Sequence, residues 1–182
     1  MFILASNSPR RKALLKEIIN DFKVVVKPID ESKYPVDQLS YYKAIEIASD
    51  YPDDIIISGD TVVILDNVIL GKPKDAQDAY NKLKSLSNKT HEVKTSYTIY
   101  SKNKSINVTR IVTSKVTFND LSEELISSYI AYGSCFDKAG AYGIQDNDKF
   151  PLIKEIKGSY NNIVGFPIEE IKEDLVKLNL IK

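Results

Sequence analysis

Apolar residues gather into short runs rich in β-branched and aromatic side chains, separated by stretches in which they recur at helical spacing. The runs predict strands, because buried strands read as nearly continuous apolar segments. We expect strands at residues 2–5, 23–27, 55–65, 68–70, 91–101, 106–118 and 150–156. Asp66 and Asn67, between the third and fourth runs, suit a tight hairpin turn.

Helix boundary signals fill the gaps between these strands. Ser8 and Pro9 form an N-cap and first-position pair, and Pro52 ends a helix. We expect a first helix that begins at Ser8 and carries Leu14, Leu15, Ile18 and Ile19 inward, and a second over 38–50 with Tyr42, Ile45 and Ala48 on one side. Two further helices are expected over 75–86 and 122–133, and a last one is expected to begin at Ile168. This order predicts an α/β fold, a mixed sheet flanked by helices in one domain over residues 1–182, simple or two-lobed.

Charge and composition narrow the range of functions. Lysine plus arginine and aspartate plus glutamate both number 25, so no net positive field exists to bind a nucleic-acid polymer or an anionic membrane. The only cysteine, Cys135, cannot form an intramolecular disulfide, and the only histidine, His91, cannot build a Cys/His zinc cage. Since the first apolar run is too short for a secretion signal or a membrane span, we expect a cytoplasmic protein.

Two arginines break a rule of helix stability at the start of the first predicted helix. Arg10 and Arg11 lie in its first turn, where the positive end of the helix dipole disfavours cations. With the Ser8 hydroxyl and free backbone N–H groups, they would form a phosphate site. The alternative is that both arginines are solvated or pair with a carboxylate.

Asp60 is a carboxylate between two strongly apolar runs, residues 55–57 and 62–65. A charge in buried sequence needs a partner. A metal ion, a basic residue or a catalytic water would each provide one. The alternative is a polar turn residue beside Gly59.

Three further polar positions carry weaker signals. Glu31, beside Asp30 in a loop after a strand, offers oxygen ligands for a hard cation such as Mg²⁺. Lys72 follows the predicted hairpin and would return towards the end of the sheet that holds Asp60, whereas Lys43 lies on a predicted helix. From spacing alone, a solvated surface is the more common place for both lysines, and acidic loops are common too.

The segment at residues 137–145 contains small residues that let backbone approach a ligand closely. Tyr142 can stack on a nucleotide base and Gln145 can hydrogen-bond to one, although a structural glycine loop is the alternative. Motifs of P-loop proteins, dinucleotide-binding proteins and serine hydrolases are absent from the sequence.

These features occur in a known order. The motifs are Leu4-Ala5-Ser6-Asn7-Ser8-Pro9-Arg10-Arg11, Asp30-Glu31, Lys43-Ala44, Gly59-Asp60-Thr61-Val62-Val63, Gly71-Lys72-Pro73, Thr90-His91-Glu92-Val93, residues 137–145, Gly158-Ser159-Tyr160 and Val164-Gly165-Phe166-Pro167. Together they resemble the Maf family of nucleotide pyrophosphatases, also called septum-formation-like proteins. Asn88 and Ser58 depart from the usual motifs, and we expect neither to disturb the local backbone.

The resemblance implies a Maf/inosine-triphosphatase-like fold, with a long curved mixed sheet and helices around a cleft, often as a homodimer, and a divalent cation, Mg²⁺ or Mn²⁺. Asp60 matches the family's proposed catalytic base. Arg10, Thr61 and Gln145 match positions associated with substrate choice. The Ala-Tyr-Gly-Ile-Gln sequence resembles the branch that hydrolyses dTTP and UTP to the monophosphate and pyrophosphate.

On this resemblance, we expect Glu31 and Asp60 to hold the metal ion, directly or through water. The nucleoside triphosphate substrate would be bound by Ser8, Arg10, Arg11, Lys43, Thr61, Lys72 and Gln145. Two alternatives stay open at this point. One is a nucleotide-binding regulatory module of cell division without turnover, and the other is a pyrophosphatase that acts mainly on modified nucleotides.

Overall fold

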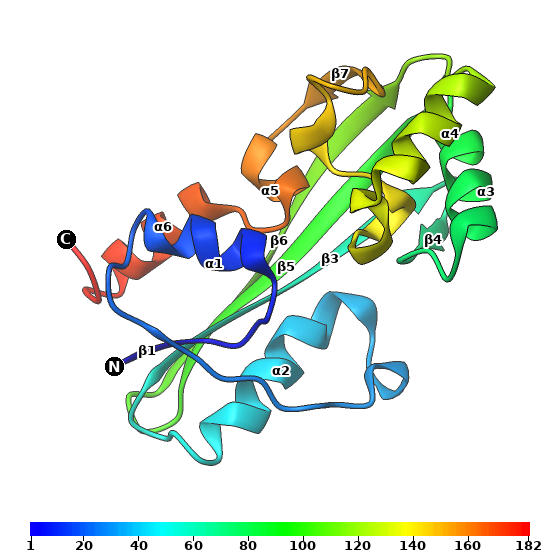
Figure 1. The fold of residues 1–182 in the computed structure, drawn as a ribbon. Coiled ribbons are helices and arrows are strands. Elements are labelled where there is room, and N and C mark those ends of the chain that lie inside the picture. Colours follow the sequence, from blue (N-terminus) through cyan, green and yellow to red (C-terminus); the bar gives the residue numbers. More distant parts are fainter. The chain divides into compact units, whose positions relative to one another are not determined.

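The computed structural model describes residues 1–182, and seven strands in it form one sheet (Figure 1). The elements are β1 (Phe2–Leu4), α1 (Pro9–Lys16), β2 (Lys23–Val24), η1 (Glu31–Lys33), η2 (Val36–Gln38), α2 (Leu39–Ala48), β3 (Ile55–Leu65), β4 (Val68–Leu70), α3 (Ala76–Leu86), β5 (Thr90–Ser101), β6 (Ile106–Phe118), α4 (Glu123–Tyr132), η3 (Ser134–Asp137), η4 (Ala139–Ala141), η5 (Ile144–Asp146), β7 (Ile153–Lys157), α5 (Tyr160–Val164) and α6 (Ile168–Lys177). The sheet order is β2-β1-β3-β5-β6-β7, with β4 paired to β3.

Parallel and antiparallel pairs occur in this one sheet. β1 runs parallel to both β2 and β3, with Leu4 opposite Val24 and Ile57. β4 runs antiparallel to β3 across a turn whose two residues, Asp66 and Asn67, have φ angles of 49° and 64°. Both φ angles are positive, as the expected tight hairpin requires. The predicted mixed α/β sheet is confirmed.

The chain divides into two compact units. Unit 1 comprises Met1–Asp60, Thr95–Val112 and Gly165–Lys182, and unit 2 comprises Thr61–Lys94 and Thr113–Val164. The strands β3, β5 and β6 contribute residues to both units. None of the helices combines the length and the apolar character needed to cross a bilayer.

Unit 1 has helices on both faces of its strands. Figure 1 shows α2 on one face and α1 and α6 on the other. On the α2 face, Ile3 and Ile56 of the strands, and Ala5 directly after β1, pack against Ala44, Ile47 and Ala48. This packing fixes the position of α2 and of the polar side chains that it carries on its remaining surface.

Unit 2 has one larger apolar cluster. Its members come from the strands, from α3, α4 and α5, from the turns between residues 134 and 146, and from the segments just before α4 and β7: Val63, Leu65, Ala79, Leu83, Leu86, Val93, Val116, Phe118, Leu121, Ile126, Tyr129, Cys135, Ala141, Tyr142, Ile144, Leu152 and Ile163. Asp75 and Ser122 cap α3 and α4 as predicted, and Gly133 ends α4 with a φ of 86°. Asn88 has a φ of 56°, so its turn is kept as expected.

Several predicted boundaries in unit 1 were wrong. β2 covers only Lys23–Val24, because its partner β1 has just three residues before the chain turns into α1. The helix α1 ends at Lys16, so Ile18 and Ile19 lie beyond it, although Ile19 is buried as expected. In α2 the buried residues include Leu39, Ser40, Ala44 and Ile47, and Tyr42 is only half-buried.

In unit 2 the last strand is shifted and one helix was missed. β7 covers Ile153–Lys157, because Phe150 instead donates its backbone N–H to Asp146 O and packs its ring near Tyr129 and Tyr132. The loop predicted at 137–145 contains short 3₁₀ turns, and the five-residue helix α5 follows β7.

His91 is a core residue of unit 2. Its side chain is 2 % exposed, Nε2 lies 2.6 Å from the Tyr142 hydroxyl, and Nδ1 has no hydrogen-bond partner. The Phe118 ring lies against it edge-on, with ring centroids 5.2 Å apart. Burial lowers the pKa of His91 to about 4, so the neutral imidazole is the folded form.

The first prediction is a pH dependence of stability. The unfolded chain binds a proton on His91 below a pKa of about 6.5, whereas the folded chain does so only near 4. The contribution of His91 to the free energy of unfolding is therefore at its maximum above about pH 6.5. It falls towards pH 4 by about 1.4 kcal/mol per pH unit at most. Urea unfolding of the wild type and of His91→Gln between these pH values measures the difference, and parallel pH profiles would contradict it.

The second prediction concerns Gly158, whose φ is +124°. A Cβ there would lie 2.5 Å from Ser114 Oγ and 3.1 Å from Ser114 Cα. We expect Gly158→Ala to lower the free energy of unfolding by about 2–4 kcal/mol, from backbone strain and overpacking together. Gly71→Ala is the matched control, since nothing lies within 4 Å of its added carbon. Equal urea midpoints for the two variants would show that the Gly158 site relaxes freely.

Candidate active site

The first turn of α1 has the geometry predicted for it. Ser8 is the N-cap, its hydroxyl accepts the Arg11 backbone N–H at 3.4 Å, and Pro9 follows at the first helical position. No acidic residue lies in this turn. The positive end of the helix dipole is therefore reinforced by the side chains of Arg10 and Arg11, an arrangement that favours an anion.

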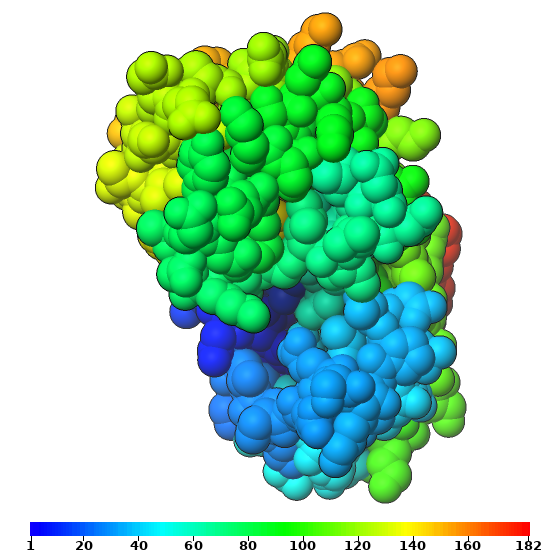
Figure 2. All heavy atoms as spheres, turned by 90° about the vertical axis from the view of Figure 1, so that its right-hand side faces the viewer, coloured from blue at the N-terminus to red at the C-terminus, as the bar shows by residue number.

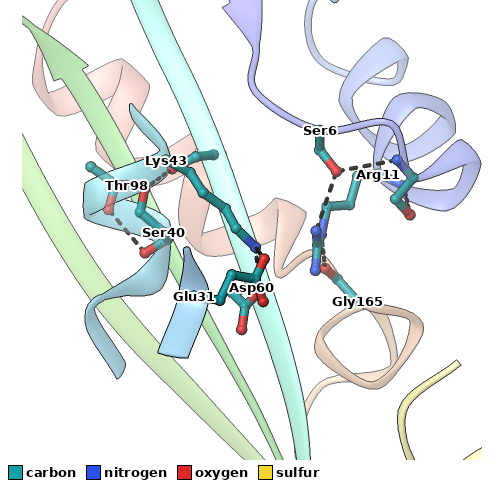
Figure 3. A network of polar contacts seen from close by, with 10 residues as sticks. Ser6, Arg11, Glu31, Ser40, Lys43, Asp60, Thr98 and Gly165 are labelled. Atoms are coloured by element: carbon teal, nitrogen blue, oxygen red, sulfur yellow. Dashed lines mark hydrogen bonds and ion pairs between the residues drawn. The ribbon is translucent and has the colours of Figure 1, made fainter. Parts of the chain in front are cut away.

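The Arg11 side chain is held in a fixed orientation. Its Nε donates to the Gly165 carbonyl at 2.9 Å and its Nη1 donates to Ser6 Oγ at 3.2 Å (Figure 3). Burial lowers the pKa of Arg11 to about 10, and the charges of Asp60 and Glu31 oppose that shift. The guanidinium therefore stays charged at neutral pH, poorly hydrated and close to both carboxylates.

Gly59 makes room for this arginine. A Cβ on Gly59 would lie 2.9 Å from Phe166 Cε2 and 3.3 Å from Arg11 Nε. The bare backbone of β3 therefore lets an aromatic ring and a guanidinium pack directly beside the residue that precedes Asp60.

Asp60 is joined to Lys43 and Glu31. Lys43 Nζ lies 2.7 Å from Asp60 Oδ1 and 2.8 Å from Glu31 Oε1. Figure 3 shows Lys43 reaching from α2 to Asp60, with Glu31 beside the pair. The Asp60 and Lys43 side chains are 15 % and 20 % exposed, so this pair is partly withdrawn from water, whereas Glu31 is 56 % exposed. In Figure 2 the blue segment before α2 lies at the surface.

Hydrogen bonds fix the helix that carries Lys43. The buried Ser40 hydroxyl lies 3.0 Å from Thr98 Oγ1 of β5, and Ser58 Oγ of β3 donates to the Ser40 carbonyl. Ser58, expected only to be tolerated, therefore anchors α2. Tyr34 stacks on Tyr42 with centroids 3.8 Å apart and so holds the segment after Glu31 against the same helix.

Two carboxylates could hold a metal ion in unit 1. No group of three or more histidine, cysteine, aspartate or glutamate side chains is arranged as a metal site. However, Glu31 and Asp60 present oxygens to one point, now held by the Lys43 ammonium. Mg²⁺ commonly takes one or two protein carboxylates and completes its shell with water and substrate phosphates. The residues present fit such an ion.

Three of the expected site residues belong to unit 2. Thr61 follows Asp60 in β3 and is half-buried. Lys72 is exposed in the segment after β4, and the neighbouring Gly71 carbonyl accepts the Gly140 N–H at 3.2 Å, which places this segment beside η4. Gln145 is an exposed residue of η5.

Gly143 shapes the backbone close to Gln145. A Cβ on Gly143 would lie 2.7 Å from Lys138 Cε and 3.1 Å from Gln145 Oε1. The missing side chain therefore lets the stem of Lys138 and the amide of Gln145 pack against the backbone. Lys138 had not been predicted to contribute, and its ammonium donates to Asp137 Oδ1 at 2.9 Å.

The expected residues thus fall into two groups by unit. Unit 1 brings together Ser8, Arg10, Arg11, Glu31, Lys43 and Asp60, and unit 2 contains Thr61, Lys72 and Gln145. Sequence reasoning missed Ser6 and Gly165, which bond to Arg11 of the first group. It also missed Ser40 and Ser58, whose hydrogen bonds fix the helix that carries Lys43. The motif order included Ser6 and Gly165 without assigning them a contact.

Known proteins resemble this chain over nearly its whole length. The Maf-like protein family matches residues 1–178. The dTTP/UTP pyrophosphatase of Ruminiclostridium cellulolyticum is 41 % identical, covering 97 % of this chain and 95 % of that protein. The dTTP/UTP pyrophosphatase of Thermosipho africanus is 45 % identical, covering 93 % of this chain and 88 % of that protein.

A solved structure supports the fold. The Staphylococcus aureus Ham1 protein aligns with a TM-score of 0.59 at 13 % sequence identity, covering 97 % of this chain and 98 % of that one. At this identity the likeness concerns the fold alone. The family match over nearly the whole sequence and the high identity to full-length relatives show the membership directly. The chain belongs to the Maf family.

Proposed function

We propose that the chain hydrolyses dTTP and UTP to the nucleoside monophosphate and pyrophosphate. The observation that carries the proposal is the 41 % identity, over 97 % of the chain, to a relative named dTTP/UTP pyrophosphatase. The charges of unit 1 supply matching chemistry, because cations and carboxylates are grouped there as phosphoanhydride cleavage requires.

We infer that the cations of unit 1 bind the triphosphate. Arg10 and Arg11 lie at a helix N-terminus, and guanidinium groups pair with phosphate oxygens through two parallel N–H donors. Arg11 needs no reorganisation, since Ser6 and Gly165 already fix its orientation. Ser8 adds a hydroxyl at the same helix end, and we assign Lys72 of unit 2 a further phosphate contact.

Asp60 is the catalytic residue in this proposal. It orients a water molecule and accepts its proton while the water oxygen bonds to the α-phosphorus. The bond from that phosphorus to the bridging oxygen breaks, and pyrophosphate leaves with the electron pair, so no covalent enzyme intermediate forms. The Lys43 ammonium bridges the carboxylates of Asp60 and Glu31. Its positive charge offsets their mutual repulsion and keeps them aligned.

A divalent cation fits between Glu31 and Asp60. When bound there, Mg²⁺ or Mn²⁺ supplies positive charge that neutralises phosphate oxygens. Arg11 adds compensating charge from a fixed position, and the Lys43 ammonium, displaced from between the two carboxylates, becomes available to phosphate oxygens. We expect activity to depend on the added cation.

Base choice is assigned to Gln145 and Thr61. A glutamine amide both donates and accepts, so it matches the O4 and N3–H groups of thymine and uracil. Cytosine presents an amino donor and a bare ring nitrogen at those positions and would leave buried groups unpaired, at a cost of about 1–3 kcal/mol. Gln145 is exposed and can therefore reach a ligand.

The cytosol is the proposed location, in keeping with a lone, buried cysteine, Cys135. The homodimer that the resemblance implies stays a prediction. Sedimentation of the purified chain measures its mass in solution and so tests it.

The third prediction concerns the products. Incubation with UTP or dTTP and Mg²⁺ should yield the nucleoside monophosphate and pyrophosphate in equal amounts, and chelation of the metal should stop the reaction. Ion-exchange chromatography separates the nucleotides, and separate assays detect pyrophosphate and orthophosphate. A nucleoside diphosphate with orthophosphate as first products would refute cleavage between the α- and β-phosphates.

The fourth prediction concerns Asp60→Asn, which keeps the size of the side chain and removes its charge. Since the water loses its proton acceptor and the cation loses a ligand, kcat should fall by roughly 10²–10⁴-fold. The exposed Asp148→Asn is the matched control and should retain normal turnover. Circular dichroism checks that both variants are folded, and near-normal kcat in folded Asp60→Asn would remove the proposed role.

A further inference from the structure

One buried tyrosine forms hydrogen bonds to residues on both sides of Gln145. The Tyr129 hydroxyl, on α4, accepts the Gly143 backbone N–H at 3.0 Å and donates to Asp146 Oδ2 at 2.8 Å. These two hydrogen bonds span residues 144 and 145. The yellow-green α4 and the yellow turns that follow it can be traced in Figure 1.

Asp146 closes the other side of this short turn. Its Oδ2 also accepts the Ser134 hydroxyl at 2.6 Å, its backbone N–H donates to the Gly143 carbonyl at 3.1 Å, and its own carbonyl accepts the N–H of Phe150 at 2.9 Å. The carboxylate therefore receives two hydroxyl donors from a helix and a turn that lie outside η5. Gln145 is exposed between the buried Ile144 and the tethered Asp146.

Tyr129 is itself packed in the core. It is fully buried, and its ring packs near Phe150 with centroids 5.2 Å apart. Burial raises the pKa of Tyr129, so its hydroxyl stays protonated at every working pH. A protonated hydroxyl can donate to Asp146 while it accepts from Gly143, and no other side chain bonds to both ends of the turn.

We propose that Tyr129 is the positioning residue for base selection, acting through the Gly143–Asp146 turn to fix the amide of Gln145. This rests on the proposed function, in which that amide distinguishes uracil from cytosine. Discrimination by a hydrogen bond requires a fixed donor and acceptor, because a mobile amide rotates or shifts to satisfy either base. Tyr129 touches neither substrate nor metal in this account.

The experiment compares two tyrosine variants. Tyr129→Phe removes the hydroxyl that ties the turn. Tyr97→Phe is the matched control, because Tyr97 is also fully buried and donates to the buried Asp174 at 2.6 Å, in unit 1. Each protein is assayed for kcat and KM with UTP and with CTP, and its melting temperature is recorded. Gln145→Ala serves as the reference for lost base selection.

Both tyrosine variants should lose stability, but only Tyr129→Phe should lose selectivity. We expect its ratio of kcat/KM for UTP over CTP to fall by roughly tenfold, through a higher KM for UTP at a nearly unchanged kcat. Tyr97→Phe should keep the wild-type ratio within about twofold. A merely structural role for Tyr129 would lower the melting temperature and leave the ratio unchanged.

The outcomes separate this inference from the function on which it rests. If the wild type discriminates UTP from CTP and Gln145→Ala does not, an unchanged ratio in Tyr129→Phe overturns the positioning role alone. If the wild type does not discriminate, both ideas fall. If Tyr129→Phe does not fold, Asp146→Ala removes the carboxylate to which the Tyr129 hydroxyl donates, and an unchanged ratio there overturns the proposal equally.

Discussion

Asp60 lies on β3 directly after buried residues that include Ile57, Ser58 and Gly59, and its own side chain is 15 % exposed. A carboxylate in such a place is destabilising unless a cation compensates it. Lys43 provides that charge from α2. The helix must therefore dock in one position on the strands, and the buried hydroxyl contacts of Ser40 hold it there.

The same ammonium also brings Glu31 to the site. Two carboxylates and three cationic side chains, those of Arg10, Arg11 and Lys43, then lie in one unit of the chain. The excess of positive charge suits a triphosphate, and the pair of carboxylates suits a divalent cation and an attacking water. Because Arg11 is already held by Ser6 and Gly165, it requires little reorganisation when substrate binds.

Local signals in the sequence predicted much of the fold and the site. The spacing of apolar residues and the helix-capping residues predicted the positions of most helices and strands. The two arginines at a helix start and the carboxylate in an apolar run were recognisable because each lies where its charge is unfavourable. The predicted strand at 23–27 was too long, because the length of β2 depends on its pairing with β1 and no local pattern shows that pairing. The predicted resemblance to the Maf family is confirmed.

Contacts between distant residues could not be derived from the pattern. Lys43 and Asp60 are 17 residues apart on a helix and a strand, and the spacing of Lys43 alone favoured a solvated face. Tyr129 and Asp146 are also 17 residues apart, and no local pattern in the sequence indicates that they bond. Such pairs become visible only when packing has fixed which faces of two elements meet.

The central claim is that water activated at Asp60 attacks the α-phosphorus. Hydrolysis of UTP in water enriched in oxygen-18, under single-turnover conditions so that products do not exchange, locates that attack by mass spectrometry. The account predicts one labelled oxygen in UMP and none in pyrophosphate. Label in pyrophosphate with unlabelled UMP would place the attack on the β-phosphorus and contradict the account.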